Sequence, residues 1–130
     1  MSLEQDFARA AIDWLAGDAA LMSRVNGVFH RSPVRIAAPY VVLDDVLATD
    51  WSTKDRPGRE ARLAFTIRDG SDDAAPVAAI TAALETRLAA MPRTGESYRL
   101  VNLTPLRSRT LRIDALWLVT LDYRARLLQF

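Results

Sequence analysis

The spacing of apolar residues along the chain predicts two main helices. The first covers residues 3–16, where apolar side chains recur at the i, i+4, i+7 and i+8 positions of one buried face, and Gly17 is suited to end it. The second follows the turn Asp69–Asp73, accepts Pro76 in its first turn and ends near Met91. The buried face of the first helix consists of Phe7, Ala11, Trp14 and Leu15, and that of the second consists of Val77, Ile80, Leu84 and Leu88.

Most of the remaining chain has the pattern of β-strands. Val28–Arg31 is a short candidate strand. Tyr40–Leu47 is apolar on both faces, which is typical of a strand inside a sheet. Arg62–Arg68 alternates between apolar and polar residues, as a strand with one buried face does. Two further extended segments, Tyr98–Leu106 and Leu111–Leu128, follow the second helix.

The order of these elements is helix, two or three strands, helix and two strands. This order predicts an α+β fold, in which an antiparallel or mixed β-sheet is packed by the two main helices on one face and ends in a long C-terminal hairpin. No repeat, low-complexity tract or linker interrupts the sequence, so residues 1–130 are expected to form a single domain.

The final extended segment is long for a domain of this size. Residues 109–126 as one straight strand would span about 60 Å, whereas a compact domain of this length has a radius of gyration near ~14 Å. The segment therefore either bends at a bulge or projects from the body as a hairpin or arm.

Composition excludes several functional classes. The 130 residues contain no cysteine, which excludes disulfides, thiol catalysis and cysteine-bound metals. There is no apolar segment long enough to cross a membrane. A net charge of +1 argues against a non-specific nucleic-acid binder. Lys54 is the only lysine among 17 basic residues. The excess of arginine reflects either genomic base composition or bidentate pairing at subunit interfaces.

The residues that could perform chemistry are isolated from suitable neighbours. His30, the only histidine, has no nucleophile motif beside it. Asp44 and Asp45 are adjacent in a strand and face opposite sides, so they cannot share a metal. Asp72 and Asp73 suit the start of a helix. We therefore assign no catalytic residue, no cofactor and no metal site.

The segment Pro39–Ala64 carries the most information. An apolar run leads into a polar loop, Trp51–Glu60, and the chain then returns as the alternating strand. The motifs are PYV, then DWSTK, then GRE. This pattern resembles the tail-completion, or tail-terminator, proteins of long-tailed phages and gene transfer agents, and the resemblance extends over nearly the whole chain.

The resemblance implies a structural virion protein at the head–tail junction, assembled in the bacterial cytoplasm. Such a protein would form a homo-oligomeric ring, typically a hexamer, that caps the tail tube and joins it to the head. Its partners would be the tail-tube protein and the head–tail connector protein, and DNA would pass through the lumen without specific binding. A head-side connector or stopper protein and a small dimeric ligand-binding α+β domain are the alternatives.

Contacts with neighbouring subunits are expected at the polar loop and near the ends of the last segment. Trp51 either packs back on the body or anchors a partner. The arginines of the last segment either contact DNA or lie in solvent and in ion pairs with Asp114 and Asp122. The predicted interface residues are Asp50, Trp51, Lys54, Asp55, Arg56, Arg59, Glu60, Arg109 and Arg112.

Overall fold

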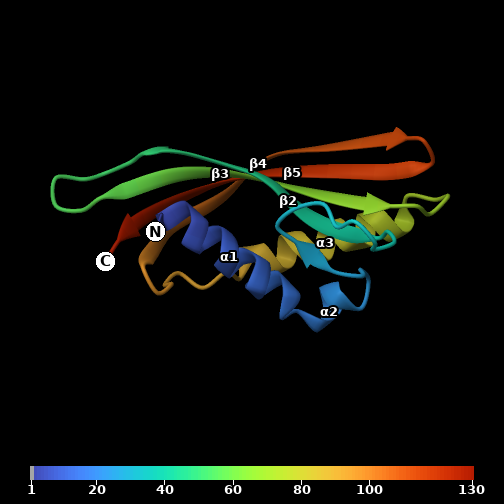
Figure 1. The fold of residues 1–130 in the computed structure, drawn as a ribbon, viewed down its shortest axis with the longest axis horizontal. Helices are drawn as coiled ribbons and strands as arrows, with labels where there is room; N and C mark the ends of the chain where they lie inside the picture. The colour runs from blue at the N-terminus through green and yellow to red at the C-terminus, as the bar shows by residue number, and fades with distance from the viewer. Residues whose placement is uncertain (1) are drawn as a thin grey trace.

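The computed structural model describes residues 2–130, which form one five-stranded sheet with three helices on one face (Figure 1). The strand order is β1-β2-β3-β5-β4; β1 is parallel to β2, and the other neighbouring pairs are antiparallel. This arrangement confirms the predicted α+β fold with a helix-covered sheet and a C-terminal hairpin. The elements are α1 (Leu3–Ala16), α2 (Ala19–Met22), β1 (Val28–Phe29), β2 (Tyr40–Asp50), β3 (Gly58–Asp69), α3 (Ala75–Ala89), β4 (Tyr98–Ile113) and β5 (Leu116–Gln129).

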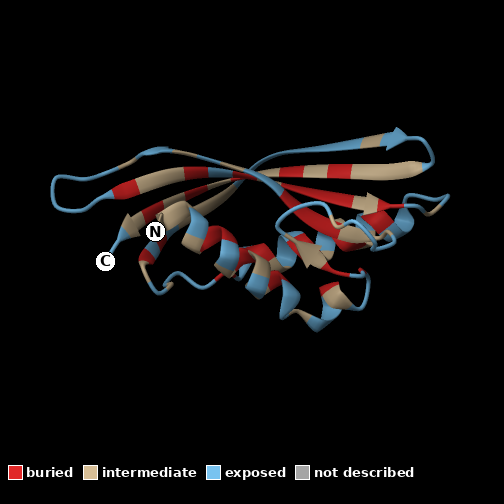
Figure 2. Cartoon of the chain, viewed as in Figure 1, coloured by how far each residue is buried: buried red, intermediate tan, exposed pale blue. Residues whose placement is uncertain are grey.

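The core lies between the sheet and the helices. Alternate residues of β5 from Val119 to Leu127 are buried, as are the alternate residues of β3 from Ala61 to Ile67. The predicted apolar faces of α1 and α3 pack against them, which confirms both helix assignments. Figure 2 shows that burial is concentrated where the helices lie under the sheet and fades toward both ends of the long strands.

Local chemistry sets the start of each main helix. The Ser2 hydroxyl accepts a hydrogen bond from the backbone N–H of Gln5 at 3.2 Å and so caps α1. The Asp73 carboxylate accepts a 2.6 Å hydrogen bond from the N–H of Ala75 at the start of α3. Gly17 ends α1 with a right-handed φ of −81°, so this stop does not use the conformational freedom of glycine.

Trp14 and Arg87 hold α1 and α3 together by three contacts. The Trp14 indole N–H donates to the Arg87 carbonyl oxygen at 2.7 Å, and the Arg87 Nε–H donates to the Trp14 carbonyl oxygen at 2.8 Å. The guanidinium carbon also lies 3.4 Å from the centroid of the indole ring, within the range of a cation–π contact. Trp14 is therefore half-buried at the rim of the core, with its polar atom satisfied.

The strands differ from the sequence-based prediction in several respects, three of which change the picture of the sheet. β2 is buried only from Val41 to Leu43; a bulge then follows, and Leu47 is 67% exposed. Because β1 covers only two residues of β2, most of β2 is an edge strand and not an inner strand. β3 begins at Gly58, so the connecting loop is 51–57, shorter than the predicted Trp51–Glu60.

The third difference concerns the last segment. It is not one extended strand from Leu111 to Leu128, because the chain reverses at Asp114 and Ala115, with φ values of 49° and 65°. β4 and β5 are thus one long hairpin closed by a two-residue turn with both residues in the left-handed region, the geometry that suits the twist of paired strands. Of the two alternatives left open by the sequence, the structure has the hairpin.

The two long hairpins lie at opposite ends of the molecule. Figure 1 shows the β2–β3 hairpin extending past α1 at the end where both chain termini lie. The β4–β5 turn lies at the other end, above the end of β3, from which the chain continues into α3. The helices cover the middle of the sheet, so both hairpin ends are left exposed (Figure 2).

The left-handed turn at Ala115 gives a test of the hairpin geometry. An alanine at φ 65° is strained, so Ala115→Gly should raise the free energy of unfolding by about 0.5–1 kcal/mol in urea denaturation. Ala82→Gly, at an exposed position within α3, is the matched control and should lower it by a similar amount. A loss of stability in Ala115→Gly would contradict the two-residue turn.

The buried Tyr123 gives a test of the core. Tyr123 is 5% exposed, and its ring meets Phe65 edge-on at 6.1 Å between centroids. Desolvation, followed by the negative charge of Glu85, raises the pKa of Tyr123 from 10.0 to about 12. Because the folded state holds the neutral phenol, the unfolding free energy should fall between pH 10 and pH 12 by about 1–2 kcal/mol.

Tyr123→Phe is the control for this alkaline loss, since phenylalanine fills the same space and does not titrate. The loss should shrink in this variant. A remainder is expected from Tyr98, because burial and then Asp6 raise the pKa of that phenol as well. An unchanged pH profile in Tyr123→Phe would show that other groups cause the alkaline loss.

Candidate subunit interfaces

The residues considered for chemistry do not come together. His30 is exposed, and Asp44 and Asp45 occupy the bulge of β2, where Asp44 accepts a hydrogen bond from the Thr66 hydroxyl. Within residues 2–130, no three side chains of the metal-binding types gather into a candidate metal site. Over the same residues, no helix is both long and apolar enough to cross a lipid bilayer.

The β2–β3 loop is ordered by hydrogen bonds of its own. The Trp51 N–H donates to the Gly58 carbonyl oxygen at 2.9 Å, which closes the loop. The Ser52 hydroxyl donates to Asp50 Oδ1 at 2.6 Å and accepts from the Gly58 N–H at 3.0 Å. The loop tip then presents three charged residues to solvent. These are Lys54, Asp55 and Arg56.

Trp51 packs back onto its own chain. Its ring is half-buried, and the guanidinium carbon of Arg126 lies 5.4 Å from the ring centroid. The neighbouring Gly58 has no room for a side chain, because a Cβ there would lie 2.5 Å from the Trp51 carbonyl oxygen. The indole therefore packs against Arg126 of its own chain, and its predicted contact with a neighbouring subunit remains a prediction.

Arg59 and Glu60 belong to β3 and have partners within the subunit. Arg59 lies on the helix side of the sheet, 3.4 Å from Glu4 of α1. Glu60 lies on the opposite side and accepts a 3.0 Å hydrogen bond from Arg126 of β5. Both residues therefore fix the base of the hairpin, and their predicted contact with a neighbouring subunit remains a prediction.

The arginines of the β4–β5 hairpin are mostly engaged within the subunit too. Arg107 forms a 2.6 Å ion pair with Asp122, one of the two carboxylates proposed from the sequence. Arg112 donates to the Ser71 carbonyl oxygen at 2.7 Å, and its guanidinium carbon lies 4.9 Å from the Trp117 ring centroid. Arg109 is exposed on β4. This pattern fits the ion-paired interpretation of the cluster better than a DNA-binding surface.

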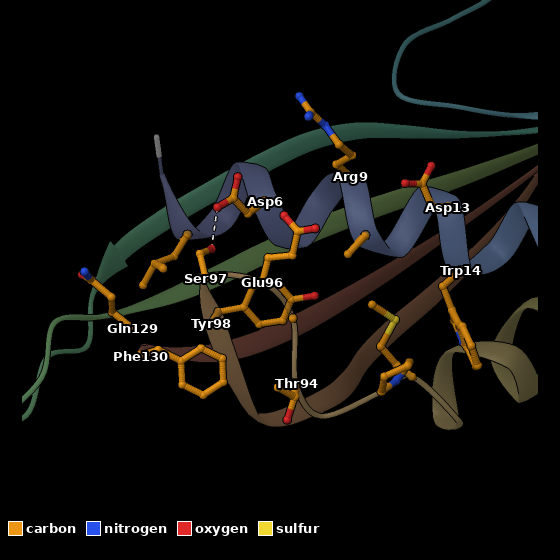
Figure 3. Close-up of a pocket in the computed structure, with 15 residues that line it drawn as sticks. Asp6, Arg9, Asp13, Trp14, Thr94, Glu96, Ser97, Tyr98, Gln129 and Phe130 are labelled. Carbon is orange, nitrogen blue, oxygen red and sulfur yellow. Dashed lines mark hydrogen bonds between the residues drawn. The ribbon is translucent and has the colours of Figure 1, made fainter.

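No feature of the sequence indicated a groove on the surface of the folded chain. This groove, of about 1030 Å³, lies between α1 and the connection that leads into β4, and the C-terminal Phe130 closes one end (Figure 3). Its walls come from the start, the middle and the end of the chain, and their residues show no shared motif. Sequence spacing along any single element could not have found it.

Comparison with known proteins places the chain in a class of phage tail structural proteins. It belongs to the family described as tail completion protein gp17, whose profile matches residues 9–128, and this confirms the resemblance seen in the sequence. Among solved structures, a chain from the virion of a native gene transfer agent particle shares the fold. The TM-score is 0.82, with 24% sequence identity over 98% of both chains. The search of curated proteins found no match.

The intramolecular partner of Arg59 leads to a stability prediction. Arg59→Glu would place a second carboxylate beside Glu4, and should lower the free energy of unfolding by about 1 kcal/mol. Arg56→Glu, the same change at the exposed loop tip, should alter it by less than about 0.5 kcal/mol. Thermal and urea denaturation of the two variants gives the comparison, and equal effects would show that the Glu4 contact contributes nothing.

Proposed function

We propose that this protein is a non-enzymatic ring subunit that caps the tail tube and joins the tail to the head. The observation that carries the proposal is a fold of the tail completion family with two unlike exposed ends. A closed ring with rotational symmetry needs a heterologous interface, in which each copy offers one surface to one neighbour and a different surface to the other.

The unlike ends supply such surfaces. One end carries the β2–β3 loop with both charge signs at its tip, and the other carries the β4–β5 turn with Arg109 exposed. Charged groups of this kind set register and partner choice more than overall affinity. The resemblance to tail-completion proteins implies that the ring is typically a hexamer. It would lie at the head–tail junction, with the tail-tube protein on one face and the head–tail connector protein on the other.

The contacts that the arginines make within the subunit support a ring through which DNA passes without being bound. Arg107 and Arg126 are paired with carboxylates, and Arg112 is held by a backbone carbonyl oxygen. Phosphate contacts would make passage slow and dependent on salt. The net charge of +1 agrees with weak attraction to DNA.

Particles that lack this protein give the primary test. Electron microscopy should show tails of uncontrolled length and tails separate from full heads. Tails of normal length beside heads that fail to retain DNA would indicate the head-side connector instead. Normal tails on full heads would exclude both roles.

The loop tip gives a sharper test in assembled particles. Arg56→Glu should lower the yield of particles with attached tails, because it replaces the positive charge at the exposed tip and leaves the fold intact. Arg24→Glu, a matched change at an exposed residue outside both hairpins, should leave the yield unchanged. Equal yields from the two variants would show that Arg56 does not contribute to the interface.

A further inference from the structure

We propose that the groove between α1 and the β4 connection receives residues 30–38 of the next copy in the ring. We call this segment, which joins β1 to β2, the basic loop. The proposal rests on the ring proposed above and names the contact between neighbours. The apolar lining of the groove, the charges on its rim and the composition of the basic loop support this contact.

The groove is apolar inside. Met91 and Tyr98 are buried at its base, and Ala10 and Trp14 of α1 line one wall. Phe130 closes the end of the groove and is itself 59% exposed (Figure 3). An open cleft that leaves a phenyl ring this exposed gains free energy when an apolar segment covers it.

The rim of the groove is acidic. It carries three carboxylates, Asp6, Asp13 and Glu96, against one guanidinium, that of Arg9. Asp6 accepts a hydrogen bond from Ser97, which fixes it to the opposite wall. Asp13 and Glu96 are exposed and form no ion pair within residues 2–130. The groove therefore suits a partner that combines apolar and basic side chains.

The basic loop has this composition. Val34 is 95% exposed and Ile36 is 43% exposed. Arg35 lies between them in sequence and Arg31 precedes them, and both arginines are exposed as well. No acidic residue occurs in residues 19–43. The basic loop therefore complements the groove, because its exposed apolar side chains match the apolar lining and its cations match the acidic rim.

The two other exposed segments fit the groove less well. In the β4–β5 hairpin, Arg107 and Arg112 already have partners within the subunit. The β2–β3 loop adds Asp55 to its cations and has none of the large exposed apolar residues of the described chain. In the basic loop, by contrast, strongly exposed Val34 lies next to Arg35, which forms no ion pair in residues 2–130.

The placement of the two surfaces suits a ring. The groove opens beside both chain termini, whereas the basic loop lies toward the other end of the helix layer (Figure 1). Two different patches, toward opposite ends of one subunit, form a heterologous interface, and repetition of this contact closes a ring when the rotation between copies allows it.

Disulfide trapping tests the contact directly, because the chain has no cysteine of its own. Two differently tagged copies, Val34→Cys and Thr94→Cys, are produced together in particles, which are then oxidised. Thr94 is an exposed residue of the groove rim. A disulfide-linked dimer that carries both tags is expected. Thr86→Cys, an exposed threonine of α3 outside the groove, replaces Thr94→Cys as the control and should give none.

Particles with attached tails but without the mixed dimer would overturn the groove contact while the ring proposal stands. Val34–Val34 dimers would instead indicate an isologous contact and would also overturn it. Linkage of the Thr94→Cys copy to a different virion protein would show that the groove serves another partner.

A charge exchange covers the case in which the cysteine variants fail to assemble. Arg35→Asp and Asp13→Arg should each lower the yield of tailed particles severalfold, and the double variant should restore it. Normal yields from both single variants would overturn the proposal. So would folded double variants that stay defective while unmutated particles assemble.

Discussion

The register of β5 between β3 and β4 is the constraint on which the rest of the structure depends. β5 pairs along its length with both neighbours, and its alternate residues from Val119 to Leu127 are buried on the face that the helices cover. A shift by one residue would turn these side chains out to water and bring Asp122 and Arg126 into the core. The same register sets Arg126 opposite Glu60, so the charged pairs of the outer face follow from the apolar pattern of the inner face.

Beyond the part of the sheet that the helices cover, contacts between arginine and tryptophan stabilise the long strands in place of an apolar core. Trp51 lies beside Arg126 at one end, and Trp117 lies beside Arg112 at the other. Such contacts cover apolar rings with side chains that stay partly hydrated, so a hairpin end is stiffened without a core of its own. The abundance of arginine therefore has a structural use within the subunit, in addition to the two explanations that composition suggested.

The sequence predicted the parts of the fold that repeat with a period. The apolar faces of α1 and α3 and the alternation of β3 follow from residue spacing alone. The turn at Asp114 and Ala115 was missed, because neither residue is glycine and apolar residues continue on both sides. The end of β2 was missed because Thr49 and Asp50 are polar and no large apolar residue follows Leu47 in the strand. The groove joins segments that are distant along the chain, and only the tertiary structure brings its walls together.

The balance of forces in this fold suits an assembly that forms on a template. The exposed charges that would set contacts between copies are screened by solvent, and such pairs contribute at most about 1 kcal/mol each. A single contact of this strength would not hold two free subunits together. In the proposed ring, copies positioned on the end of a tube would be present at a high effective concentration, at which the same weak contacts could close the ring. If the protein forms the last ring of a tail, as proposed above, interfaces that are weak in isolation would restrict its assembly to that place.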